Sequence, residues 1–88
     1  LFVACRNGHE NVVKYLVERG ANIHGKNKDG ETPFFIACEN GHVNVAKYLA
    51  EQGANIHKEN EYAETPLFIA CEKGHEKVVK YLVEQGVD

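Results

Sequence analysis

The sequence predicts an all-α fold in which pairs of antiparallel helices stack on one another as a solenoid. Three observations lead to this prediction. The 88 residues repeat with a period of 33: residues 1–28 agree with 34–61 at 18 of 28 positions, and 29–55 agree with 62–88 at 17 of 27. Each copy contains two short apolar segments with helical spacing, and a glycine follows each segment. A fixed period of this length is typical of stacked structural units.

The first helix of the middle copy is expected to begin at Pro33. Thr32 suits the N-cap, and proline suits the first helical position because its missing N–H is not needed there. The apolar run that follows stops at Gly41, a residue typical of the position just after a helix. The third copy repeats the pattern from Thr65, whereas the first copy joins it in mid-helix at Leu1.

The second helix of the middle copy is expected to run from Val43 to about Gln52. Val45, Tyr48 and Leu49 lie at positions i, i+3 and i+4 and form one apolar face. Both helices of a copy are too short to be stable alone in water. Each copy therefore needs its neighbour to bury its apolar face. An extended polar loop then leads to the next copy.

These motifs resemble the ankyrin repeat. Residues 32–38, TPFFIAC, are similar to the family's T-P-L-H-x-A-A, residues 41–42 to its G-H, and residues 53–56, GANI, to its G-A-D-V-N landmark. The resemblance covers essentially the whole chain, and the period of 33 is the family's own. It implies an ankyrin-repeat α-solenoid, an L-shaped stack of paired antiparallel helices joined by β-hairpin-like loops.

The resemblance implies a single domain over residues 1–88. Repeat 1 spans 1–28 and is truncated at its N-terminal side, repeat 2 spans 29–61, and repeat 3 spans 62–88 and is truncated at its C-terminal side. Neither end has the polar outer face that terminal repeats usually carry. We therefore expect either a fragment of a longer array or a stack that shields its uncapped ends by self-association.

The sequence departs from the family pattern at two places. The motif histidine is replaced by phenylalanine in each copy, at Phe2, Phe35 and Phe68. In the last loop, Ala63 stands where the family turn requires the positive φ that Gly30 can adopt, and Tyr62 precedes it. An alanine with positive φ costs roughly 1 kcal/mol, unless the turn has changed shape.

The three cysteines, Cys5, Cys38 and Cys71, are expected to act as small buried residues. Stacked helix pairs lie about 10 Å apart, whereas a disulfide needs Cα atoms within about 7 Å. A catalytic pair of Cys38 and His42 is the alternative, but the same pair recurs in every copy and no third group orients it. We therefore predict no catalytic residue.

The histidines are predicted to be structural. His9, His42 and His75 are expected to close the turn between the two helices of their copy with backbone hydrogen bonds. His24 and His57 are expected to stabilise the loops. Because the repeat spreads these side chains along the stack, no metal site is expected. The chain has no serine and no glycine loop of phosphate-binding spacing, so we expect no enzyme and no cofactor.

The resemblance implies that a partner protein binds on the concave side, against the loop tips and the first helices. The residues at matching positions that we predict to contact a partner are Arg6, Asn7, Lys28, Asp29, Glu31, Glu39, Asn40, Glu59, Glu61, Tyr62, Glu64, Glu72 and Lys73.

Charge varies along the stack. Residues 1–28 carry a net charge of +3, residues 29–61 carry −4 and residues 62–88 carry −2. The concave face of the last two repeats is thus expected to be acidic and to bind a basic protein surface, with Tyr62 as an aromatic anchor. The alternative is that these charges only keep the surface soluble.

Other partner classes are disfavoured. The net charge of −3 gives no sign of nucleic-acid or membrane binding, and no apolar run is long enough to span a bilayer. Three cysteines in an odd count favour an intracellular, cytoplasmic setting. We predict a non-catalytic protein–protein interaction module. The alternative is a rigid structural spacer within a longer array, with no partner of its own.

Overall fold

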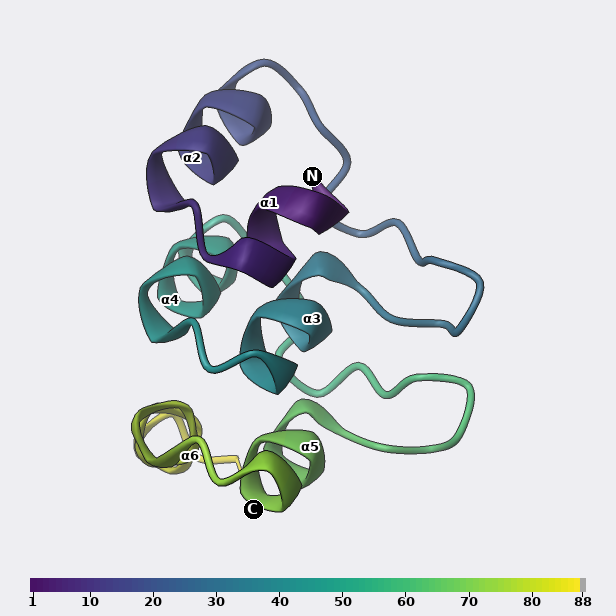
Figure 1. The fold of residues 1–88 in the computed structure, drawn as a ribbon, viewed down its shortest axis with the longest axis vertical. Helices are drawn as coiled ribbons and strands as arrows, with labels where there is room; N and C mark the ends of the chain where they lie inside the picture. Colours follow the sequence, from purple (N-terminus) through teal and green to yellow (C-terminus); the bar gives the residue numbers. More distant parts are fainter. Residues whose placement is uncertain (88) are drawn as a thin grey trace.

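The computed structural model describes residues 1–87, and this part of the chain contains six helices and no strand (Figure 1). The helices are α1 (Phe2–Asn7), α2 (Glu10–Glu18), α3 (Pro33–Glu39), α4 (Val43–Glu51), α5 (Pro66–Lys73) and α6 (Glu76–Glu84). The prediction of an all-α solenoid is confirmed.

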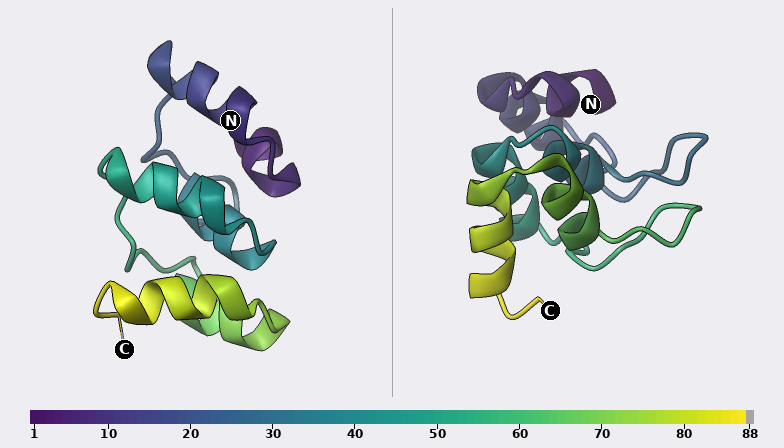
Figure 2. Two further views of the ribbon diagram at one scale, coloured as in Figure 1. Left: turned by 90° about the vertical axis from the view of Figure 1, so that its left-hand side faces the viewer. Right: turned by 60° about the horizontal axis from the view of Figure 1, so that its bottom comes forward.

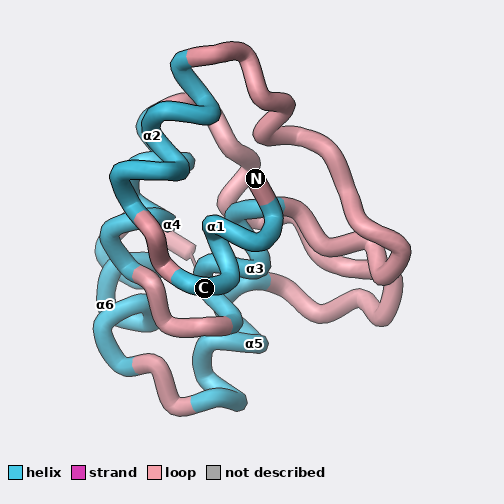
Figure 3. Tube along the Cα trace, turned by 45° about the horizontal axis from the view of Figure 1, so that its top comes forward, coloured by secondary structure: helices cyan, strands magenta, loops and turns pink. Residues whose placement is uncertain are grey.

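The helices form two parallel rows. Figure 1 shows α1, α3 and α5 in one row and α2, α4 and α6 in the other, with α3 in contact with both α1 and α5, and α4 in contact with both α2 and α6. Figure 2 shows the three helix pairs as successive layers. The two long loops between pairs project to the same side of the stack (Figure 3).

The first helices begin where the sequence predicts. The Thr32 hydroxyl oxygen accepts a hydrogen bond from the N–H of Phe35 at 3.1 Å, and Thr65 accepts one from Phe68 at 3.1 Å. The prolines that follow each threonine occupy the start of α3 and α5. In the second row, α4 ends at Glu51, one residue before the position expected.

The core is densest in the middle pair, because this pair is covered on both sides. Phe34, Ile36, Val45 and Leu49 of α3 and α4 are all fully buried. Their apolar faces meet residues of the first and last pairs within one continuous cluster. Each pair thus buries the face of its neighbour, as the short helices require.

The burial of the cysteines also depends on how far neighbouring helix pairs cover them. Cys5 and Cys38 are buried, whereas Cys71 is exposed. The expectation of a buried residue is therefore wrong for Cys71. Within residues 1–87, no further helix pair covers the outer side of α5 (Figure 1).

Candidate functional site

The tip of the second long loop is organised by one buried asparagine. The side-chain oxygen of Asn60 accepts hydrogen bonds from the N–H groups of Tyr62 and Glu64, at 2.9 and 3.0 Å. Its amide nitrogen donates to a carboxylate oxygen of Glu64 at 2.8 Å. Asn60 is only 7% exposed, so these bonds satisfy a buried polar group. Asn27 makes the same three bonds in the first long loop.

The two loop tips are joined to each other. The N–H of Glu61 donates to the carbonyl oxygen of Asp29 at 3.1 Å. Tyr62 lies beyond this bond with 66% of its surface exposed. Ala63 has a φ of 63°, close to the 76° of Gly30 in the equivalent turn. The turn has therefore kept its shape, and the alanine adopts the unfavourable left-handed conformation.

Replacing Ala63 by glycine is expected to raise the free energy of unfolding by about 0.5–1 kcal/mol, because glycine adopts this φ without strain. Urea denaturation followed by circular dichroism measures the change. The reciprocal control is Gly30→Ala, which should destabilise the chain: its new Cβ would lie 2.8 Å from the backbone nitrogen of Glu61. A neutral or destabilising Ala63→Gly change would contradict the strain at this position.

Three of the predicted carboxylates are coupled through Glu39, on which the charges of the other two act. Burial raises the pKa of Glu39 at the end of α3, and the neighbouring charges of Glu31 and Glu64 raise it further. Lys73 and Arg6 act in the opposite direction on this pKa. We call Glu31, Glu39 and Glu64 the acidic triplet. Glu31 and Glu64 both repel the charge of Glu39, so a cation placed beside Glu39 is stabilised electrostatically.

The remaining predicted partner residues fall into two groups. One group lies at the loop tips: Lys28, Asp29, Glu59, Glu61 and Tyr62. The other lies at or near the C-terminal ends of α1, α3 and α5: Arg6, Asn7, Asn40, Glu72 and Lys73. Glu39, Asn40, Lys73 and His75 together line a hollow between the second and third pairs. Glu31 and Glu64 also have a role within the loops, since each accepts a hydrogen bond from the asparagine of its tip.

A family profile described as "Ankyrin repeats (3 copies)" matches residues 1–88. The chain belongs to the ankyrin repeat family. It is 47% identical over 34 residues to "Ankyrin repeat protein OPG189" of Vaccinia virus (strain Copenhagen), covering 39% of this chain and 6% of that protein. It is 52% identical over 33 residues to "Ankyrin repeat and KH domain-containing protein mask" of Drosophila melanogaster, covering 38% of this chain and 1% of that protein. The chain thus spans a small part of both relatives. Ankyrin repeats are generally non-enzymatic modules for protein–protein interaction.

Two histidines bridge successive ankyrin helix pairs. The Nε2–H group of His42 donates to the carbonyl oxygen of Arg6 at 2.8 Å, and that of His75 donates to the carbonyl oxygen of Glu39 at 2.8 Å. The backbone N–H groups of His42 and His75 close the turn of their own pair, as expected, by donating to the carbonyl oxygens of Ala37 and Ala70 at 2.9 Å. The rings, by contrast, reach back to the preceding pair. These bonds satisfy carbonyl groups at the C-terminal ends of α1 and α3, which have no partner within the helix.

The buried thiols of the ankyrin stack do not suit nucleophilic chemistry. Burial raises the pKa of Cys5 to about 11 and also raises that of Cys38, which disfavours the reactive thiolate. The Nε2 atom of His42 is occupied by its bond to Arg6. Among residues 1–87, no group of three or more His, Cys, Asp or Glu side chains is placed to hold a metal ion. None of the helices in this range is both long and apolar enough to cross a membrane.

Proposed function

We propose that this ankyrin chain is a non-catalytic interaction module that binds a basic protein surface on its concave face, through the loop tips and the first helices. The observation that carries the proposal is the acidic triplet. Burial and the charges of Glu31 and Glu64 raise the pKa of Glu39, so keeping this carboxylate ionised in the unbound protein costs free energy. A lysine or arginine of a partner relieves that repulsion and adds charge-assisted hydrogen bonds.

Tyr62 is proposed as the aromatic anchor beside the triplet. Its side chain is mostly exposed, and the neighbouring carboxylate of Glu61 raises its pKa. An exposed aromatic ring on a backbone fixed by Asn60 can bury a large area at low entropic cost. Together, the ring and the carboxylates suit a partner that presents an apolar contact next to a basic one.

The proposal predicts that neutralising the triplet weakens partner binding at least about tenfold, or about 1.4 kcal/mol. The variant is Glu31→Gln, Glu39→Gln and Glu64→Gln together. Glutamine keeps the oxygen that accepts the bonds from Asn27 and Asn60, so the loops should retain their structure. Proteins are captured from a cell extract on each chain, purified and titrated by calorimetry, after circular dichroism has shown that the chains are equally helical.

The matched control removes three exposed charges from the second row, by Glu18→Gln, Glu51→Gln and Glu84→Gln. It has the same net charge as the triplet variant and should bind like the native chain.

Binding of the partner to the native chain should also fall as the pH is lowered toward the pKa of Glu39, which lies above its ordinary value of 4.5, because protonated Glu39 does not attract a cation. If Tyr62→Ala lowers the free energy of binding by less than about 0.5 kcal/mol in the same titrations, Tyr62 is not an anchor.

The alternative function is a rigid spacer with no partner of its own. Contacts that recur between layers favour it: the amino group of Lys14 lies 5.7 Å from the ring centroid of Tyr48, and that of Lys47 lies 5.7 Å from the ring centroid of Tyr81. With the histidine bridges, they tie each pair to the next. Equal capture by the native, triplet and control chains would favour the spacer.

We also propose a reducing compartment such as the cytoplasm as the setting of this chain, since its three cysteines are all free. The net charge of −3 and the acidic triplet argue against nucleic acids and anionic membranes as partners.

A further inference from the structure

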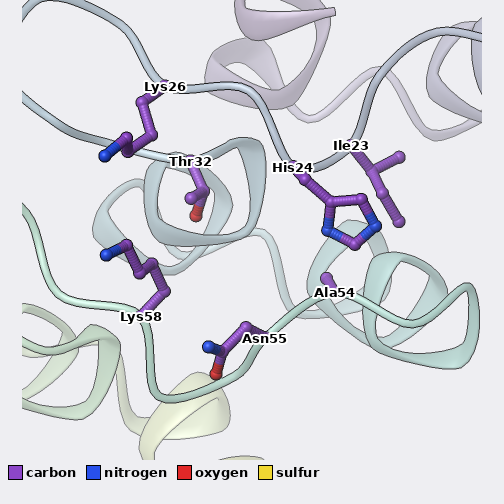
Figure 4. A pocket seen from close by; sticks show the side chains of 7 residues that line it. All are labelled: Ile23, His24, Lys26, Thr32, Ala54, Asn55 and Lys58. Carbon is purple, nitrogen blue, oxygen red and sulfur yellow. The ribbon is translucent and has the colours of Figure 1, made fainter.

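A pocket of about 200 Å³ lies between the loop that follows α2 and the loop that follows α4 (Figure 4). Its polar lining consists of His24, Lys26, Thr32, Asn55 and Lys58. Figure 4 shows Lys26 and Lys58 extending from different loops toward the same side of the pocket, with the Thr32 hydroxyl between them in this view. None of its lining residues belongs to the acidic triplet.

Most of the free polar groups that line this pocket are hydrogen-bond donors, and the ring of His24 offers one donor and one acceptor when it is neutral. The Thr32 oxygen already accepts the N–H of Phe35, so its own hydrogen remains free to be donated. The Asn55 side-chain oxygen accepts the N–H of His57 at 2.9 Å, which leaves its NH₂ group to donate. Lysine side chains have only donors. The pocket is therefore rich in donors.

The lining of the pocket itself is positively charged, and the nearest acidic side chains that share a surface with its lysines are Glu59 and Glu61, in the adjoining hollow at the loop tips. No aspartate or glutamate lines it. Within residues 1–87, neither Lys26 nor Lys58 has a carboxylate within 4.0 Å. Two ammonium groups on one small cavity repel each other, and an anion between them would offset this repulsion.

The ankyrin framework does not require these lysines. One period of 33 residues places Glu59 at the position of Lys26, and Gly25 at the position of Lys58. His24, by contrast, recurs as His57. The two lysines are therefore particular to the junction between the first and second pairs. A feature that the fold does not need, placed on a cavity, indicates binding.

We propose that this pocket binds a phosphoryl group. A phosphomonoester carries close to two negative charges at neutral pH and three acceptor oxygens, which match two lysines and the hydroxyl and amide donors beside them. A carboxylate carries a single charge and would leave one lysine unbalanced. The inference is independent of the proposed function, because the pocket and the acidic triplet share no residue.

The test is a titration of the native chain with inorganic phosphate at constant ionic strength, followed by two-dimensional ¹H–¹⁵N NMR. Saturable shifts are expected at the backbone amides of Lys26, Asn55 and Lys58. Lys26→Glu should weaken binding at least about tenfold, since it places an anion beside the phosphate. Lys26 is exposed and the matching residue of the next repeat is a glutamate, so the variant should fold.

The matched control is Lys28→Glu, which makes the same charge change in the same loop but outside the lining of this pocket. Its affinity should stay within about twofold of native, because solvent screens a charge at the loop tip. Shifts that do not saturate would overturn the proposal, as would equal weakening by both variants.

A second arm identifies the source of the phosphoryl group. A short peptide containing phosphoserine is titrated beside the same peptide with serine. Tighter binding of the phosphopeptide than of inorganic phosphate indicates a phosphorylated side chain of a protein. Equal binding of the two phosphate probes indicates a small phosphate compound, and binding of the serine peptide alone contradicts the proposal.

Discussion

Replacing Phe35 by alanine is expected to lower the free energy of unfolding by about 3–5 kcal/mol. Its side chain is 0% exposed on α3, which is packed between α1 and α5. Removing the ring forfeits its transfer free energy and leaves a cavity that rigid neighbours on both sides cannot fill. A domain of this size has a total stability of roughly 5–10 kcal/mol, so much of it would be lost. Urea denaturation followed by circular dichroism gives the value.

The chain supplies its own control for this prediction. Phe68 stands one period later, in α5, but is 50% exposed because no helix among residues 1–87 covers its outer side. Phe68→Ala should therefore cost only about 1 kcal/mol. Equal losses for the two variants would show that burial between layers is not what stabilises this position. The pair also explains how a phenylalanine can replace the family's polar residue: in the middle layer it contributes apolar burial.

Local features of the fold could be predicted from the sequence. The starts of α3 and α5 follow from Thr32 and Thr65 with the prolines after them, because capping involves residues only three positions apart. The buried face of α4 follows from the spacing of Val45 and Leu49. The positive φ of Ala63 follows from its equivalence to a glycine of the previous repeat.

Features that depend on the contact between layers could not be predicted in this way. The acceptor for His42 lies 36 residues earlier on the preceding pair, and a repeating pattern alone does not say which layer a ring will reach. Lys26 and Lys58 occupy different positions of their repeats, so only the stacking of the loops brings them to one pocket. The role of Asn60 can be predicted from the sequence, because Asn27 occupies the same position one period earlier and a glutamate follows each asparagine after four residues.

Only part of the candidate binding surface could be predicted from the sequence. Charge counts along the chain indicate an acidic middle repeat, and the charges of Glu31 and Glu64 do act on Glu39. The charge counts alone do not show that Glu31 and Glu64 also hold their loop tips together through the asparagines; that role is indicated only by the recurrence of the Asn27/Glu31 pair as Asn60/Glu64. Charge neutralisation with glutamine separates these two roles, because it removes the charge and keeps the acceptor.

Replacing Gly41 by alanine is expected to destabilise the chain by about 2–5 kcal/mol. Gly41 has a φ of 76°, so alanine carries a strain of about 1–2 kcal/mol there. Its Cβ would also lie 2.6 Å from Nδ1 of His75, a distance that the ring cannot tolerate. The ring must move and lose its bond to the carbonyl oxygen of Glu39, which adds about 1–3 kcal/mol. The measurement is again urea denaturation.

Gly74→Ala separates the cost of a positive φ from the cost of the clash with the His75 ring. Gly74 occupies the equivalent turn with a φ of 74°, yet a Cβ built there meets nothing within 4 Å. It should show the strain alone, about 1–2 kcal/mol. In a His75→Ala background, the cost of Gly41→Ala should fall to that of Gly74→Ala, since the obstructing ring is gone. If Gly41→Ala and Gly74→Ala cost the same in the native background, the histidine bridge contributes little, and the layers are held together mainly by their apolar faces.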